Sequence, residues 1–191
     1  MWWAPLLNNI VGFLGEGVAA STNSYESIAT VTVGAGGSSS VTFSSIPSTY
    51  KHLQIRMMVR EAGTGANGSY VGMRFNSDTS SNYTMHRLLG DGSSASAAAY
   101  VSQNTNYLER VASASQGSNV FGVIVVDILD YTNTNKYKTS RNLGGWDSNG
   151  SGWLTFNSNL WSSTSAITQI DLGIDTGNFQ QYSSFALYGV K

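Results

Sequence analysis

Residues 51–60, KHLQIRMMVR, alternate between apolar and polar side chains, and this alternation is the strongest constraint on the fold. Leu53, Ile55 and Met57 fall on one side, whereas the residues between them are mostly polar. Successive side chains of a β-strand point to opposite faces of its sheet. The pattern therefore predicts a strand with one core face and one polar face.

Similar short segments recur along the chain, separated roughly every ten to fifteen residues by turns rich in Gly, Ser and Asn. Residues 119–131 are apolar on both sides and predict a central strand covered on both faces, whereas residues 91–99 predict a low-complexity loop. Charged residues make up only 11% of the chain, too few to line the exposed faces of many helices. We therefore expect an all-β fold, an antiparallel β-sandwich of jelly-roll type with about eight to ten strands.

The first 23 residues differ from the rest and predict an N-terminal arm in front of a single β-sandwich domain at 24–191. Residues 1–20 contain one charged side chain, Glu16, and many large apolar ones that lie near one face at helical spacing. We expect a short helix or an extended arm that buries this face against its own domain or against a neighbour. The predicted anchoring residues are Trp2, Trp3, Leu6, Leu7, Ile10, Val11, Phe13 and Leu14.

Composition and motifs argue against several classes of function. A net charge of −1 offers no basic surface to nucleic acid, and the absence of cysteine excludes disulfides and zinc–thiolate sites. The apolar N-terminal stretch is short and interrupted by Asn8, Asn9 and Glu16, so it does not predict a membrane-spanning helix. The chain has no Gly-x-Ser-x-Gly elbow and no phosphate-binding loop followed by Lys and Ser or Thr. We therefore expect no enzymatic activity and no cofactor.

Two weak candidates for an ion site also receive simpler interpretations. His52 and His86 lie on alternating segments, where a solvated histidine is the simpler assignment. The segment 147–150, Asp-Ser-Asn-Gly, resembles the start of a calcium loop, but it lacks the third ligand. Ser158 also stands where the bidentate glutamate of such a loop should lie, so we predict a turn and no metal site.

One segment, WLTFNSNLW at 153–161, suggests a binding surface. Its alternation predicts that Leu154, Phe156 and Leu160 face the core, which leaves two Trp and two Asn on the opposite face. Aromatic planes stack on sugar rings and amides bond their hydroxyl groups, so an exposed Trp/Asn face is a candidate glycan site. The alternative is that these Trp pack under loops or at a subunit interface. The candidate residues are Trp146, Trp153, Asn157, Asn159 and Trp161.

Both ends of the predicted domain resemble a known group of proteins. The segment 24–56 contains a strand, a Gly/Ser turn, TFSSIP and then YKHLQIR, and the segment 183–191 reads SSFALYGVK. This succession resembles β-structured virion proteins of tailed bacteriophages, which include capsid decoration (cement) proteins and tail-fibre or receptor-binding components. The resemblance implies that the chain is a structural component of a virion. The matching residues belong to strands and turns, so the resemblance assigns no functional site.

Three hypotheses follow for the function. The leading one is a non-enzymatic structural protein on the surface of a phage particle. It would form a homo-oligomer, most simply a trimer, and the N-terminal arm would attach it to capsid or tail proteins. The alternative is a tail-fibre or receptor-binding module that recognises host surface glycan. The third hypothesis is a glycan depolymerase. This chain lacks the repetitive β-helix that is typical of such enzymes.

Overall fold

The structure is a computed structural model that describes residues 24–65 and 68–191. The predicted anchoring arm and its eight apolar residues lie outside the described residues. One short 3-10 turn, η1 (Ala114–Gln116), accompanies twelve strands. These strands are β1 (Tyr25–Thr32), β2 (Ser40–Phe43), β3 (His52–Val59), β4 (Ser69–Phe75), β5 (Tyr83–Gly90), β6 (Ala95–Gln103), β7 (Asn106–Val111), β8 (Gly122–Ile128), β9 (Lys138–Asp147), β10 (Gly152–Trp161), β11 (Ile170–Ile174) and β12 (Ser184–Val190).

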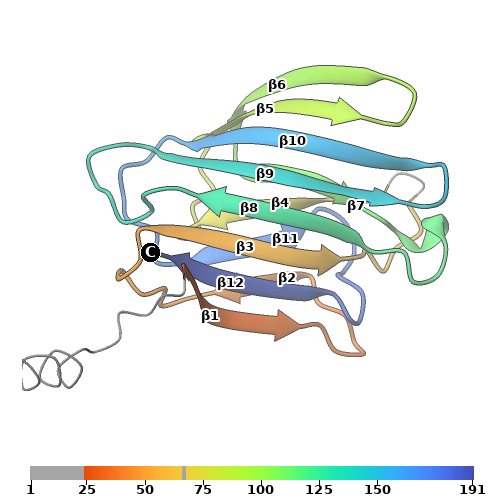
Figure 1. Ribbon diagram of the computed structural model, residues 1–191, viewed down its shortest axis with the longest axis horizontal. Coiled ribbons are helices and arrows are strands. Elements are labelled where there is room, and N and C mark those ends of the chain that lie inside the picture. Colours follow the sequence, from red (N-terminus) through yellow and green to blue (C-terminus); the bar gives the residue numbers. More distant parts are fainter. Residues whose placement is uncertain (1–23, 66–67) are drawn as a thin grey trace, which may run out of the picture.

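The strands form two antiparallel sheets that pack face to face as a sandwich (Figure 1). The larger sheet has eight strands in the order β1-β12-β3-β8-β9-β10-β5-β6, and the smaller has four in the order β2-β11-β4-β7. Figure 1 looks onto the larger sheet with the smaller one behind it. The all-β sandwich is thus confirmed, although it has twelve described strands where about eight to ten are expected from the sequence.

The connectivity explains the additional strands. Consecutive strands β1 to β4 alternate between the two sheets, and so do β7, β8, β11 and β12. The hairpins β5–β6 and β9–β10 instead both join the larger sheet, where they lie next to each other beyond β8. The larger sheet therefore consists of the four strands β1, β12, β3 and β8 and a four-stranded extension, which we call the extension sheet (β9, β10, β5 and β6) and which packs on β7 at the edge of the smaller sheet.

The apolar core lies between the two sheets, and it follows the alternation of residues 51–60. Leu53, Ile55 and Met57 on β3 are 0%, 0% and 2% exposed, so the predicted core face of this strand is confirmed. Burial of such side chains is the main favourable term in folding. The remaining core residues come from both sheets and include Phe43, Val71, Met73, Phe75, Leu108, Ile124, Val126, Ile170, Leu172, Phe179, Phe185 and Leu187.

The prediction for residues 119–131 is half correct. β8 is central in the larger sheet, between β3 and β9. It is covered on one face only, because Ile124 and Val126 are buried while Val123 is 48% exposed. The apolar side chains on its second face therefore belong to the molecular surface.

The start of β9 is held by a buried cation. Lys138 is 1% exposed, and its ammonium donates to the carbonyl oxygens of Asn133 (2.6 Å), Lys136 (3.1 Å) and Thr164 (3.0 Å). Burial lowers the pKa of Lys138 from its usual value, because the charged form loses hydration. The three carbonyl groups replace that hydration and tie the β8–β9 loop to the segment after β10.

Candidate functional site

The two faces of β10 are reversed relative to the prediction for residues 153–161. Leu154 and Phe156, predicted to lie in the core, are 61% and 48% exposed. Asn157, Asn159 and Trp161, predicted to form an exposed glycan site, are 1%, 1% and 2% exposed. The expectation of an exposed Trp/Asn face is therefore wrong. An alternating pattern separates two faces of a strand, but it does not say which face is buried when both carry large apolar groups.

The buried amides of the extension sheet bond the backbone of β7. Asn142 on β9 and Asn157 on β10 both donate through Nδ2 to the carbonyl oxygen of Leu108, the first at 2.9 Å. Asn159 Nδ2 donates in turn to Asn142 Oδ1 at 2.9 Å. Buried amides need such partners, and the carbonyl of an edge strand supplies them. Asn157, predicted to bind sugar, thus holds the extension sheet on the smaller sheet, and Asn159 fixes the Asn142 amide within the extension sheet.

The three candidate tryptophans also pack within the protein. Trp161 stacks on Tyr83 with ring centroids 6.3 Å apart, and its Nε1 donates to Asp78 Oδ2 at 2.8 Å. Trp146 is 8% exposed, and Trp153 is half-buried with the Arg110 guanidinium 5.8 Å from its ring centre. Packing under loops, the alternative interpretation of these residues, fits Trp161, which bonds the loop after β4.

The hydrogen bonds around Trp161 also lower the pKa of the Asp78 carboxyl group. Burial alone would raise its pKa, but hydrogen bonds from Trp161, Asn82 and Ser80 lower the pKa of Asp78 to about 2. The carboxylate is therefore ionised at every ordinary pH and fixes the end of β10 to the loop after β4.

Glu109 lies in the same buried layer, on the face of β7 that faces the extension sheet. It is 1% exposed, and burial raises its pKa to about 7, against the lowering effect of the Arg110 N–H and of the Arg87 and Arg110 charges. Its Oε1 accepts the Arg110 N–H at 2.6 Å. Several other buried atoms of this layer have no hydrogen-bond partner among the described residues: Asn106 Oδ1 and Nδ2, Ser140 Oγ, Trp146 Nε1, Thr155 Oγ1, Asn157 Oδ1 and Asn159 Oδ1.

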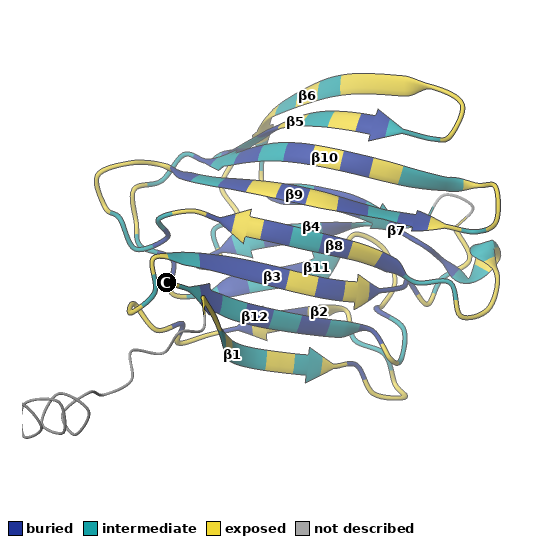
Figure 2. Cartoon of the chain, in the orientation of Figure 1, coloured by how far each residue is buried: buried dark blue, intermediate teal, exposed yellow. Residues whose placement is uncertain are grey.

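The outer face of the larger sheet carries an apolar surface. Across the strands, Val125 pairs with Leu143, Leu143 with Phe156, and Phe156 with Leu88, so these side chains form one continuous row. Exposed bands cross β8, β9, β10 and β5 in Figure 2. We call this surface the outer apolar face, and its residues are Met58, Leu88, Val123, Val125, Leu143, Leu154 and Phe156.

A groove of about 990 Å³ lies within the outer apolar face. In a second row of this face, Gly145 pairs with Val123 on one side and with Leu154 on the other, so the middle of this second row has no side chain. A Cβ on Gly145 would meet the Trp153 carbonyl oxygen at 2.2 Å, so only glycine fits here. The loops at Asp91–Gly92 and Gly150–Gly152 form the rim.

A polar row borders the outer apolar face. Gln54 Nε2 donates to Asp127 Oδ1 at 2.7 Å, and Arg141 Nη1 donates to Ser158 Oγ at 2.6 Å. Asp127 and Arg141 pair across the strands, and His86 pairs with Ser158 in the same row. This row limits the apolar surface on one side with groups of both charges.

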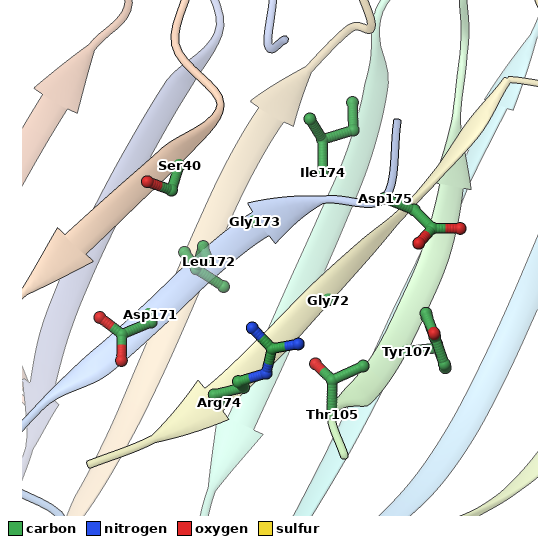
Figure 3. A pocket seen from close by; sticks show the side chains of 10 residues that line it. All are labelled: Ser40, Gly72, Arg74, Thr105, Tyr107, Asp171, Leu172, Gly173, Ile174 and Asp175. Carbon is green, nitrogen blue, oxygen red and sulfur yellow. The ribbon is translucent and has the colours of Figure 1, made fainter. Parts of the chain in front are cut away.

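The smaller sheet has a different feature on its own outer face, a trough of about 220 Å³ (Figure 3). Its floor is one row across the sheet, in which Ser40 pairs with Gly173, Gly173 with Gly72, and Gly72 with Tyr107. The two glycines remove the side chains from the middle of this row. Figure 3 shows the Arg74 guanidinium between Asp171 and Thr105, with Tyr107 and Asp175 together on the side away from Asp171.

The polar groups around the trough differ in how they are held. Asp171 accepts from Thr42 Oγ1 at 2.8 Å and from Ser77 Oγ at 3.0 Å, so its position is fixed. Arg74 Nε donates to the Asn104 carbonyl oxygen at 2.9 Å, which anchors the guanidinium through one of its nitrogens. The trough therefore offers an aromatic ring, a cation and a carboxylate around a backbone floor.

The candidate ion-binding residues have structural partners. His52 Nδ1 accepts the Asp130 N–H at 2.9 Å, while His86 lies on the exposed polar row. Asp147 Oδ1 accepts the Asn149 N–H at 2.8 Å, so the segment 147–150 is the predicted turn and connects β9 to β10. Within residues 24–65 and 68–191, no group of three or more His, Asp and Glu side chains could hold a metal ion. In the same part of the chain, no helix is long and apolar enough to cross a membrane.

Comparison of the chain with protein-family models, with curated proteins and with solved structures finds no match.

We predict that Glu109 makes the protein less stable as the pH rises. Its folded pKa of about 7 exceeds the ordinary value of 4.5, so the folded state binds one more proton between these values. The free energy of unfolding then falls by about 3 kcal/mol between about pH 4.5 and 7 and loses no more above that range. Glu109→Gln should remove this loss and be the more stable protein at pH 8. Urea unfolding at several pH values measures it, and parallel profiles for the two proteins would contradict it.

Proposed function

We propose that this chain is a non-enzymatic structural protein of a bacteriophage particle, and that its copies pack against one another through the outer apolar face. One observation carries the proposal: six exposed apolar side chains and the half-buried Val125 form a continuous surface on a single sheet face. Soluble monomers rarely leave such a contiguous patch in water. A virion-surface location and contact with capsid or tail proteins through the N-terminal arm complete the proposal.

A second copy is the occupant that suits this face best. The seven residues of the outer apolar face carry no charge, and Arg56 beside Val125 and Asp91 at the groove rim lie only at its border, so the centres of two identical faces can meet without opposing like charges. The bordering row holds Asp127 and Arg141 side by side, which allows each to face the opposite charge of a rotated copy. A different protein is usually attracted by a charged patch of opposite sign, and the outer apolar face offers no such patch.

The connectivity supports the finer assignment of the sandwich as a jelly roll. Without the two hairpins, the sheets read β1-β12-β3-β8 and β2-β11-β4-β7, two four-stranded sheets whose strands alternate along the chain. In this proposal the hairpins β5–β6 and β9–β10 are insertions into a jelly roll. They supply most of the outer apolar face, so the insertions are what adapts the fold to packing.

Replacing two exposed apolar residues should weaken self-association. Leu154→Thr with Phe156→Thr keeps strand-forming residues but removes the centre of the outer apolar face, so we expect smaller assemblies and at least about tenfold weaker association. Tyr137→Thr, a loop position that is 54% exposed, is the matched control and should assemble as the wild type does. Light scattering coupled to size-exclusion chromatography measures the mass. Equal masses for all three proteins would reject this face as the interface.

The N-terminal arm is the predicted attachment to the particle. Deletion of residues 1–20 should reduce the number of copies on purified particles, because it removes every predicted anchoring residue. Glu16→Gln in the full chain is the control that keeps the apolar face. Quantitative gel analysis of particles gives the occupancy, and unchanged occupancy after the deletion would reject anchoring. Hundreds of copies per particle in the wild type would indicate capsid decoration, and a few tens or fewer would indicate a tail or fibre.

A second candidate function, recognition of host surface glycan, is favoured by the trough on the smaller sheet. An aromatic ring beside a guanidinium and a carboxylate suits a sugar ring, which offers an apolar face and hydroxyl groups. Tyr107, Arg74 and Asp175 provide these groups around the glycine floor. This site replaces the predicted one on β10, where Asn157 bonds the β7 backbone and Asn159 bonds the Asn142 side chain.

A bulky side chain on the trough floor should abolish glycan binding without unfolding the protein. A Cβ at Gly173 has its nearest neighbour, the Ser39 carbonyl oxygen, at 4.0 Å, so the Cβ of Gly173→Val meets no backbone clash and its methyl groups occupy the trough floor. Tyr107→Ala should lower binding on a glycan array by at least about tenfold. Gly34→Ala, at an open loop position, is the control. If the wild type binds no glycan, or if Gly173→Val binds as well as the control, this candidate function is rejected.

A further inference from the structure

The strand β6 forms one edge of the larger sheet and pairs only with β5 there (Figure 1). It is nine residues long, with the sequence ASAAAYVSQ. No charged residue occurs between Asp91 and Glu109, and the strand contains no proline. An edge strand exposes a row of N–H and C=O groups that can pair with another strand.

The other three sheet edges carry features that oppose such pairing. β2 has only four residues. β7 contains Glu109 and Arg110, and a register shift interrupts its pairing with β4. β1 contains Glu26, and its pairing with β12 is shifted between Ser27 and Ala29. Short length, charge and bulges are the usual protections of an edge, and β6 alone has neither the charge nor the short length.

A bulge is present in β6, but it lies at one end. The pairing with β5 shifts between Tyr100 and Gln103, where Ser102 has a φ of 54°. Residues 95–100 before it pair with β5 in unbroken register. The free edge therefore offers a regular run of six residues with mostly alanine and serine side chains.

We propose that two copies of this chain pair through β6, antiparallel and about a two-fold axis, so that their larger sheets join edge to edge. The self-complementarity of the strand is the reason to choose a second copy. Antiparallel two-fold pairing places each strand opposite a copy of its own sequence. A charged residue near the two-fold axis would then lie close to the same charge on the other copy. Residues 95–100 carry none, and the small side chains of Ala97, Ala98 and Ala99 allow close approach.

The pairing would also extend the surface described above. Ala97 lies opposite Leu88 of the outer apolar face, and Ala99 lies opposite His86 of the polar row. Edge pairing through β6 would therefore bring the two outer apolar faces onto one continuous sheet. This contact is distinct from packing of one outer apolar face on another, and it does not depend on the phage assignment.

Cysteine cross-linking tests the pairing directly, because the chain has no cysteine of its own. Single variants Ser96→Cys, Ala97→Cys, Ala98→Cys and Ala99→Cys are oxidised in the full-length protein. Two-fold pairing predicts disulfide-linked dimers, with one position the most efficient and the yield falling on both sides of it. Thr30→Cys, exposed on the β1 edge, is the control and should not form dimers. Cross-links no stronger than this control, or stronger links in mixtures of β1 and β6 variants, would overturn the proposal.

A charge swap provides a second, reversible test. Ala97→Lys with Ala99→Lys, and Ala97→Glu with Ala99→Glu, should each weaken the pairing at least about tenfold, and an equimolar mixture should restore it. Both residues are exposed, so neither variant should alter the fold of the protomer. If cross-linking through β6 persists in Leu154→Thr/Phe156→Thr, edge pairing stands whatever the fate of the outer apolar face. Lack of effect of both charged variants and of their mixture would reject the β6 contact.

Discussion

The extension sheet depends on the hydrogen bonds that its buried amides make to one carbonyl group of β7. Asn142 and Asn157 both donate to Leu108, which ties the hairpin β9–β10 to the edge of the smaller sheet. β7 is the last strand of that sheet, so no further strand covers the extension with apolar side chains. Buried polar side chains therefore share this layer with apolar ones, and the amides of Asn142 and Asn157 find their partner in the β7 backbone. This layer supports the strands that carry Leu88, Leu143, Leu154 and Phe156, the larger part of the outer apolar face.

This arrangement also explains which part of the fold follows from the sequence. On β3 the alternation is unambiguous, because Leu53, Ile55 and Met57 oppose polar residues, and all three are buried as predicted. On β10 both faces carry large apolar groups, so the correct periodicity leads to the wrong face. The decisive fact is that an edge strand lies over Asn157, and tertiary packing of this kind leaves no trace in the local pattern. The local sequence therefore cannot show that Asn157 is buried and Leu154 is exposed, although the opposite is the usual arrangement.

The trough and the free edge could not be predicted because each depends on strand pairing. Gly72 and Gly173 lie about a hundred residues apart in the chain, and only pairing of β4 with β11 sets them side by side. The sequence predicts a low-complexity loop at residues 91–99, where Ala and Ser are weak strand formers, but β6 begins at Ala95. It is a strand because β5 provides a partner. The signal present in the sequence is the absence of charge between Asp91 and Glu109, which indicates a surface that tolerates contact.

Several of the few charged side chains of this protein make contacts within the protomer. Lys138 is caged by carbonyl groups, Glu109 is buried, and Arg56 lies 5.1 Å from the Tyr25 ring and 4.9 Å from the Tyr188 ring. Several of the few charges thus serve the fold, and fewer remain to keep neighbouring copies apart. The uncharged surfaces are a sheet face and a sheet edge, which point in different directions. Contacts through a face stack sheets and contacts through an edge widen them, so a protein with both can be connected to neighbours in two directions at once.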